Sequence, residues 1–441
     1  MPTKSTKQQN MKTLLITIIV IFSVEVKKVF SQNPANDGPV KVELRLSEDS
    51  GYQLLRNGQP YYIKGAGGST YINRVADYGG NSIRTWGTQN GKAVLDSAHK
   101  HGLTVLMGLN VARERHGFNY DDTEAVNKQL QHLKVEVEKF KDHPALLAWG
   151  IGNELNLHFK NPKVWDAVNE ISQMIHQIDP NHLTTTVLAG ANKTVIDYIK
   201  ERCKDIDLLS INTYGGLASL PETIRNVGWD GAYMVTEWGP TGHWEGLQTE
   251  WGISIEETSS EKAAVYKSRY EYSMNRDKDK CLGSYVFLWG QKQERTPTWY
   301  GLFTEKGEES EVVDVMQFLW SGKWPDNQAP HIYSLQLDLK KATDNIYIKP
   351  GSSHDLLAVA TDPDNDQLSY RWEILPEPKE FSEGGDREDR PMPILNRVTS
   401  SGNGKAAMQA PDREGPYRIF VYITDGHNNV ATANVPFFVR P

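Results

Sequence analysis

Short apolar runs alternate with amphipathic segments through most of the chain. Eight runs rich in β-branched and aromatic residues recur from residue 60 onward, and polar loops and helical stretches separate them. They are Tyr61–Lys64, Ser82–Thr85, Thr104–Leu109, Leu146–Gly150, Thr184–Leu188, Leu208–Asn212, Tyr233–Thr236 and Gly283–Leu288. Helical spacing of apolar residues is clearest in Thr123–Phe140 and Lys163–Gln177. This alternation predicts an α/β fold, a (β/α)8 TIM barrel, with a doubly wound open sheet as the competing arrangement.

The pattern changes on both sides of the predicted barrel. Before it, residues 41–59 alternate around Arg56-Asn57-Gly58 and predict a small hairpin lid. After it, the polar, proline-containing stretch Trp324–Pro330 indicates a linker. Beyond the linker, short alternating runs without helical periodicity predict an immunoglobulin-like β-sandwich. These runs are Asp355–Ala360, Leu368–Ile374, Tyr417–Thr424 and Ala431–Val439.

A basic start and a short apolar run mark the N-terminus. The run Leu14–Val24 follows Lys4 and Lys12, and its 11 residues fall short of the roughly 20 that a membrane-spanning helix needs. This predicts a secretory signal peptide cleaved before Gln32 and therefore an exported protein; the alternative is an uncleaved N-terminal anchor. The predicted organisation is a signal peptide at 1–31, a barrel with its hairpin at 32–325, a linker at 326–331 and the sandwich at 332–441.

Composition narrows the classes of partner. The chain has 441 residues, with 48 Lys and Arg against 56 Asp and Glu and a net charge of −8. This mildly acidic balance argues against nucleic acid as a partner, and no stretch beyond the signal segment predicts membrane insertion. Two cysteines, Cys203 and Cys281, exclude a disulfide scaffold and a cysteine-rich zinc site. The 12 Trp and 19 Tyr suit either a sugar-binding cleft or a well-packed core.

Two of the predicted strands end in a glutamate. The fourth run leads into Asn153-Glu154, and the seventh leads into Glu237-Trp238. Reactive groups of a (β/α)8 barrel lie at the carboxyl ends of its strands. Two carboxyls in one cleft can cleave a glycosidic bond, because one donates a proton while the other attacks the anomeric carbon. The structural alternatives are a helix-starting carboxylate for Glu154 and an ion pair with Arg84 for Glu237.

These motifs resemble a known group of enzymes. Gly152-Asn153-Glu154 and Thr236-Glu237-Trp238-Gly239 are similar to the signatures of the clan A retaining β-glycoside hydrolases. Three residues on other strands agree with the same pattern: Arg84, Tyr214 and Trp289. The resemblance covers roughly residues 55–325.

The resemblance implies a role for each polar residue. Glu154 is the general acid/base, and Glu237 is the nucleophile that forms a covalent glycosyl-enzyme. Asn153 holds the sugar 2-hydroxyl, while Arg84 and Tyr214 keep Glu237 ionised and aimed. We expect the pKa of Glu154 to be raised, because this group starts the reaction protonated. No metal and no organic cofactor are implied.

Tryptophans are the remaining candidates for contact with substrate. The resemblance assigns Trp289 to the floor of the sugar subsite. Trp86, Trp238, Trp244 and Trp299 lie at or after strand ends and are further candidates. Long aromatic loops around a barrel mouth suit a groove that binds a polysaccharide; the alternative is that these rings pin the loops to the scaffold.

No metal site is predicted. His116, His158 and His243 lack the spacing of metal ligands and are expected in loops. The segment Thr361–Asp366 has two interpretations, a calcium loop or an Asp- and Asn-rich turn, and it lacks the full ligand spacing of a dedicated loop.

The overall plan resembles glycoside hydrolase family 158 in particular. The similarity lies in the sandwich directly behind the barrel and in the 83-residue interval between Glu154 and Glu237. That family consists of endo-β-1,3-glucanases, so the resemblance implies hydrolysis of laminarin-like β-glucan by double displacement, with the sandwich as a structural companion. The alternatives are a β-1,3-glucan transglycosylase, an exo-acting β-glycosidase and a non-catalytic carbohydrate-binding protein.

Overall fold

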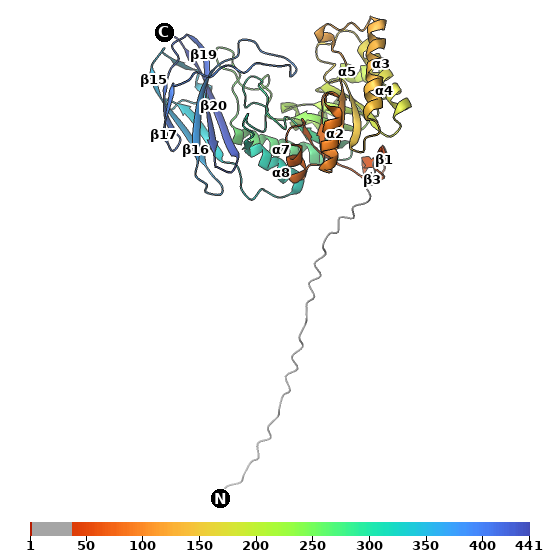
Figure 1. Cartoon of the computed structure of the whole chain (residues 1–441), viewed down its shortest axis with the longest axis horizontal. Coiled ribbons are helices and arrows are strands. Elements are labelled where there is room, and N and C mark those ends of the chain that lie inside the picture. The colour runs from red at the N-terminus through yellow and green to blue at the C-terminus, as the bar shows by residue number, and fades with distance from the viewer. Residues whose placement is uncertain (2–37) are drawn as a thin grey trace. The chain divides into compact units, whose positions relative to one another are not determined.

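The computed structural model describes residue 1 and residues 38–441, so the predicted signal peptide and its cleavage site lie outside the described residues. Eight parallel strands close into a barrel (Figure 1). They are β4 (Ile63–Gly67), β5 (Ser82–Arg84), β6 (Thr104–Leu109), β7 (Leu146–Ile151), β8 (Leu183–Ala189), β9 (Leu208–Asn212), β10 (Tyr233–Trp238) and β11 (Cys281–Val286). Pairing of β11 with β4 closes the ring, which confirms the predicted (β/α)8 barrel over the open sheet.

A helix follows each barrel strand. The helices are α1 (Ile72–Asp77), α2 (Gly91–Lys100), α3 (Thr123–Phe140), α4 (Lys163–Ile178), α5 (Lys193–Arg202), α6 (Leu220–Asn226), α7 (Ser259–Arg276) and α8 (Glu311–Ser321). Short 3-10 turns lie at η1 (Glu114–His116), η2 (Gly215–Ser219) and η3 (Ala342–Asp344). Helix α4 has the buried apolar face that its sequence predicts. This face packs against the barrel through Val164, Val168, Ile171 and Ile175. Among the described helices, none is long and apolar enough to span a bilayer.

The predicted hairpin closes the floor of the barrel rather than its mouth. It is a three-stranded antiparallel sheet of β1 (Val42–Ser47), β2 (Gly51–Arg56) and β3 (Gln59–Pro60). Val42 and Leu54 pack into a cluster with residues near the starts of the barrel strands, such as Leu208 and Leu282. Because the strands are parallel, their starts share the end opposite to the site. The prediction that this hairpin is a lid over the barrel mouth is therefore wrong.

The C-terminal part is a β-sandwich, as predicted. Its strands are β13 (His331–Leu337), β14 (Ile346–Ile348), β15 (Ser353–Thr361), β16 (Ser369–Pro376), β17 (Val398–Gly402), β18 (Lys405–Gln409), β19 (Gly415–Thr424) and β20 (Asn429–Val439). The short strand β12 (Glu309–Ser310), which precedes α8, pairs with β20 at the edge of one sheet. One sheet has the order β12-β20-β19-β16 with β14 on β20, and the other has the order β13-β15-β18-β17. Side chains from both sheets, such as Leu356 and Val421, form one apolar core between them.

A buried polar network joins the sandwich to the barrel. The ammonium of Lys262, on α7, lies 2.5 Å from one carboxylate oxygen of Glu256 and donates to the carbonyl of Thr298 at 2.7 Å. The second oxygen of Glu256 accepts from the amide of Asn434, on β20, at 2.6 Å. Side chains of Lys262 and Glu256 are 6% and 1% exposed. Loss of either member of an ion pair this well enclosed would leave an uncompensated charge in the interior.

We expect Lys262→Met to destabilise the fold by about 3–5 kcal/mol, because it leaves the Glu256 carboxylate buried without its counter-ion. Lys267→Met is the matched control, since Lys267 lies on the same helix and pairs with Glu271 at the surface at 2.7 Å. That exposed pair should contribute less than about 1 kcal/mol. Urea denaturation of both variants checks the difference, and equal losses would contradict it.

Candidate active site

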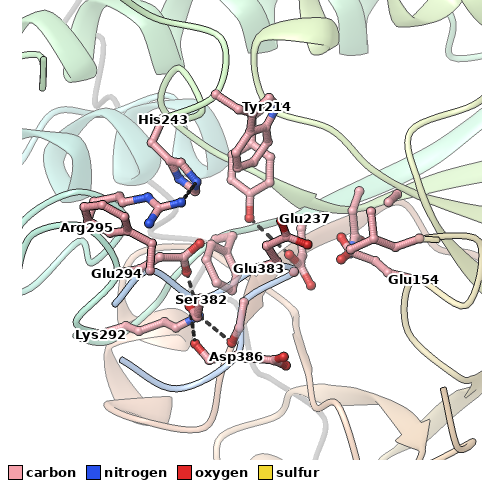
Figure 2. Close-up of a pocket in the computed structure, with 18 of the residues that line it drawn as sticks. Glu154, Tyr214, Glu237, His243, Lys292, Glu294, Arg295, Ser382, Glu383 and Asp386 are labelled. Atoms are coloured by element: carbon pink, nitrogen blue, oxygen red, sulfur yellow. Dashed lines mark hydrogen bonds and ion pairs between the residues drawn. The ribbon is translucent and has the colours of Figure 1, made fainter. Parts of the chain in front are cut away.

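The carboxyl ends of β7 and β10 bring the two predicted glutamates into one cavity (Figure 2). Glu237 is the next-to-last residue of β10 and is 5% exposed. Glu154 follows β7 and is half-buried. Both line a cavity of about 990 Å³ at the mouth of the barrel. Two carboxyl groups at one open space are the first requirement of the chemistry that their positions in the sequence predict.

A tight turn places the side chains that follow β7. Gly152 has φ +72°, and a Cβ there would lie 2.6 Å from the side chain of Leu155, so the position requires glycine. Glu154 itself has φ +55°, a conformation that non-glycine residues rarely adopt. Strained backbone of this kind clusters at functional sites, where it aims a side chain that a relaxed turn would point elsewhere.

Three donors hold the carboxylate of Glu237. Its Oε1 atom accepts from Arg84 at 3.0 Å and from the Trp86 indole at 2.7 Å, and its Oε2 atom accepts from the Tyr214 hydroxyl at 3.1 Å. Arg84 is 2% exposed and is itself fixed by a 2.7 Å bond to the carbonyl of Thr236. Bonds to a charged acceptor are short and strong, so they fix the direction in which this carboxylate points.

Glu154 sits in a different environment. Its Oε1 atom accepts one hydrogen bond, from the amide of Asn212 at 2.9 Å. Burial, and then the negative charge of Glu237, raise the pKa of Glu154 to about 7. A carboxyl group of this kind still carries its proton near neutral pH, which suits a proton donor. The direction agrees with the expectation from the sequence.

Asn153 faces the cavity beside the two carboxyl groups. Its Oδ1 atom accepts from Arg84 at 2.6 Å and from Asn212 at 3.2 Å. Within residues 38–441 its amide nitrogen makes no hydrogen bond, so that donor is available to a ligand in the cavity. Asn212 was not among the residues predicted from the sequence, although it ends β9 as a polar residue after an apolar strand, the same signal that marks Glu154.

Three of the predicted tryptophans are core residues, not cavity walls. Trp289 is fully buried, because the chain turns after β11 and directs its ring outward onto Trp320 of α8, 5.3 Å away. Trp238 is also fully buried and packs against Tyr266 at 5.3 Å. Trp299 is 3% exposed, and its indole donates to the carbonyl of Thr241 at 3.0 Å. These three rings therefore pack within the protein scaffold, which is the alternative that the sequence left open.

Other aromatic rings line the cavity. Trp244, in the loop after β10, is 57% exposed and packs edge-on against Tyr214 at 5.4 Å. Phe287, just after β11, lies on the cavity wall and packs edge-on against Trp86 at 5.7 Å. Phe287 thus stands where Trp289 was expected. From the sequence alone, two aromatic residues two positions apart after a strand do not reveal which one faces inward.

Ionisable side chains line the cavity beside these rings. His243 lines the cavity, and burial and the neighbouring Arg295 lower its pKa to about 4, so it is neutral near pH 7. Its Nδ1 atom lies 2.9 Å from the Tyr300 hydroxyl. Glu294 is a third carboxyl group in the cavity; burial raises its pKa, and Lys292 pairs with it at 2.6 Å. His158 also lines the cavity, so two of the three loop histidines lie at the site.

One group of possible metal ligands occurs among the described residues, outside the cavity. Carboxylate oxygens of Asp362, Asp366 and Asp425 lie within 4.8 Å of one another. The backbone amides of Asp364 and Asp366 donate to Asp362 at 2.9 and 3.0 Å, which is the hydrogen bonding of an aspartate-initiated turn. These hydrogen bonds agree with the second interpretation of the segment, an Asp- and Asn-rich turn.

The barrel matches a known family of catalytic domains over part of its length. The family described as "Glycosyl hydrolases family 2, TIM barrel domain" matches residues 74–241. A mannan endo-1,4-beta-mannosidase F of Aspergillus clavatus is 27% identical over 124 residues, which are 25% of this chain and 28% of the relative. A probable mannan endo-1,4-beta-mannosidase A-1 of Aspergillus terreus is 26% identical over 169 residues, 34% of this chain and 43% of the relative. The matches thus span less than half the length of these relatives.

Solved structures share the fold. Beta-glucuronidase 2 of Bacteroides uniformis superposes with a TM-score of 0.51 at 14% identity, over 91% of this chain and 48% of that chain. A beta-glucuronidase of Bifidobacterium dentium gives 0.50 at 18% identity, over 65% of this chain and 50% of that one. These structures show that the fold is shared, and the family match shows that residues 74–241 are similar to a glycosyl hydrolase TIM-barrel domain.

We expect Tyr214→Phe to lower kcat about 10- to 100-fold, because it removes one hydrogen bond to the charged Glu237 without emptying the space of the ring. Tyr266→Phe is the matched control. Its hydroxyl donates to the carbonyl of Phe287 at 3.0 Å and touches neither carboxyl group. Steady-state kinetics of both variants, with melting temperatures to show that they fold, check the prediction; equal kcat values would contradict it.

Proposed function

We propose that this protein is a retaining glycoside hydrolase that works by double displacement. The observation that carries the proposal is the pairing of Glu237, held by three donors, with Glu154, whose pKa is raised to about 7, in one cavity. Protonated Glu154 gives its proton to the glycosidic oxygen while Glu237 attacks the anomeric carbon. Ionised Glu154 then takes a proton from water, and the water displaces Glu237. Two inversions leave the configuration retained.

The neighbouring residues support both steps by position. Arg84 and Tyr214 hold the Glu237 carboxylate and oppose its rotation when a bond to carbon forms. Asn212 directs Glu154 toward the same space. We propose that the amide of Asn153 binds the hydroxyl next to the anomeric carbon, a bond that strengthens as positive charge develops on the ring.

For the substrate, we propose a laminarin-like β-1,3-glucan cut within the chain. The resemblance to glycoside hydrolase family 158 supports the linkage. The size of the cavity supports a polymer, since about 990 Å³ is at the upper end of the range for small-molecule sites. The exposed ring of Trp244 supports a subsite beyond the reacting sugar. Export after cleavage of the N-terminal segment would bring the enzyme to such a polymer.

A β-1,4-mannan is the second candidate substrate. The specific observation is that the two fungal relatives are named mannan endo-1,4-beta-mannosidases. The matches cover less than half of either relative, and a shared fold hosts many substrates, so mannan stands second to β-1,3-glucan.

The test is a panel of polysaccharides given to the purified chain. We expect laminarin to yield a ladder of oligosaccharides, with slower cleavage of mixed-linkage glucan, β-1,4-glucan and β-1,4-mannan. Glu237→Gln, which keeps the shape of the side chain, is the control for contaminating activity. Preference for mannan would favour the second candidate. Release of monosaccharide alone would contradict internal cutting, and inactivity on every polymer would overturn the proposal.

A further inference from the structure

One loop of the sandwich reaches the mouth of the barrel. The connection between β16 and β17, residues 377–397, leaves the sandwich, and its residues 381–386 all line the cavity. Ser382, Glu383 and Asp386 are labelled in Figure 2 together with Glu154 and Glu237. We call residues 381–386 the cleft segment. The resemblance to glycoside hydrolase family 158 implies that the sandwich is a structural companion, and this segment departs from that expectation.

The cleft segment is clamped to one side of the barrel rim. Asp386 accepts two hydrogen bonds from Arg115, at 2.8 and 3.1 Å, and lies 3.1 Å from His116. Both partners belong to η1, in the loop after β6. Glu383 lies 3.1 Å from His158, in the loop after β7. Bidentate pairing of arginine with a carboxylate is geometrically specific, so the segment has a defined position here.

The opposite side of the rim holds the same segment. The ammonium of Lys292, in the loop after β11, donates to the carbonyl of Gly385 at 2.8 Å. Two residues beyond the cleft segment, Glu388 accepts from the backbone amide of Arg295 at 2.6 Å. Strands β7 and β11 lie four places apart in the ring of eight, on opposite sides of the barrel. The loop therefore contacts the mouth on two opposite sides and is a wall of the cleft, not a loose appendage.

The cleft segment presents an aromatic ring to the cavity. Phe381 lines the cavity and is 46% exposed. The guanidinium of Arg295 lies 4.1 Å from its ring centroid and covers one face. The same guanidinium is 3.0 Å from His243, whose ring packs against Trp244 at 4.7 Å. Phe381 and Trp244 thus stand on one continuous wall, linked through two side chains.

We propose that Phe381 is the stacking platform of a sugar subsite, so that the sandwich supplies part of the substrate-binding cleft. The ligand is an uncharged pyranose unit of a β-linked polysaccharide, whose apolar C–H face covers the ring face that Arg295 leaves open. Burying two apolar faces against each other removes them from water, which favours binding. Hydroxyl groups at the edge of the sugar would meet the polar members of the segment, Ser382 and Glu383.

The subsite lies beyond the reacting sugar. Rings close to Glu237 are supplied by Trp86, Tyr214 and Phe287, whereas Phe381 has Arg295 as its described partner. The inference rests on the proposed function, since it assigns a further unit of the same polymer to the cleft. It predicts that loss of the ring matters more for long substrates than for short ones.

The test compares three variants on the polysaccharide that the wild type cleaves fastest, on its oligosaccharides of two to six units and on the matching nitrophenyl monosaccharide. Phe381→Ala should lower kcat/KM on the polymer about tenfold, with a loss that grows with chain length. Phe381→Tyr should restore most of the activity, because it keeps the ring. Met392→Ala is the control, since Met392 lies in the same connection, is 82% exposed and does not line the cavity.

The outcomes separate this inference from the function on which it rests. If the wild type cleaves polymer and Phe381→Ala matches Met392→Ala at every chain length, the subsite is wrong and the hydrolase proposal stands. Equal losses on the monosaccharide and on the polymer would also overturn it, because they indicate a disturbed catalytic centre. If the wild type cleaves no member of the panel, both the proposed function and the proposed subsite are contradicted.

Discussion

Replacing Glu237 by alanine is expected to lower kcat at least about 10,000-fold, because no other group can form the covalent bond to the anomeric carbon. The substitution also opens the space between Arg84 and Tyr214, which a small anion can occupy. Azide should therefore restore part of the activity. Because azide attacks a β-glycoside from the side of the missing carboxylate, the product is the α-glycosyl azide, which NMR identifies.

Glu294→Ala is the comparison for that result. Glu294 is another carboxyl group of the cavity, but Lys292 holds it rather than the three donors that hold Glu237. We expect a smaller loss and no restoration by azide. Near-normal activity of Glu237→Ala, or azide rescue of Glu294→Ala instead, would show that a different residue is the nucleophile.

Replacing Glu154 by glutamine is expected to remove the basic limb of the pH profile. In the wild type kcat/KM should fall as the pH rises through about 7, because the ionised carboxyl cannot protonate the departing oxygen. Without that group the activity on polysaccharide should be lower by about 100- to 10,000-fold and flat across this range. A dinitrophenyl glycoside should form the glycosyl-enzyme at nearly the normal rate, since its leaving group needs no proton.

The same substitution carries a prediction for stability. The pKa of Glu154 is higher in the folded chain than its ordinary value, so the folded state binds this proton more tightly than the unfolded state. The stability that this group contributes is therefore largest at acid pH and declines as the pH rises toward 7. Glu154→Gln should melt at a higher temperature than the wild type at pH 8 and show less difference at pH 4. A lower melting temperature at pH 8 would contradict the cause assigned to the shift.

The sequence predicted the elements whose signals are local. The helix at Thr123–Phe140 has the predicted bounds, and Lys163–Ile178 extends the prediction by one residue, because regular apolar spacing fixes which face is buried. Glu154 and Glu237 were found for a similar reason. A charged residue directly after a buried strand of a barrel has few places to point other than the mouth.

Contacts between distant parts of the chain were not predictable in this way. Arg115 and Asp386 are 271 residues apart, and nothing in the charged stretch around Asp386 distinguishes it from an exposed loop. The choice between Phe287 and Trp289 depends on how the chain turns after β11, which no local pattern specifies. Asn212 could have been found by extending the rule for strand ends from charged to polar residues.

The central claim is that Glu237 forms a covalent bond with the sugar. An activated 2-deoxy-2-fluoro β-glycoside of the preferred sugar tests it, because the fluorine slows the second step and traps the intermediate. Digestion and mass spectrometry should then find one glycosyl group on the peptide that contains Glu237, and none on that peptide in the Glu237→Gln variant. Time-dependent inactivation with the label on another residue, or turnover of natural substrate to the inverted anomer without any label, would contradict the claim.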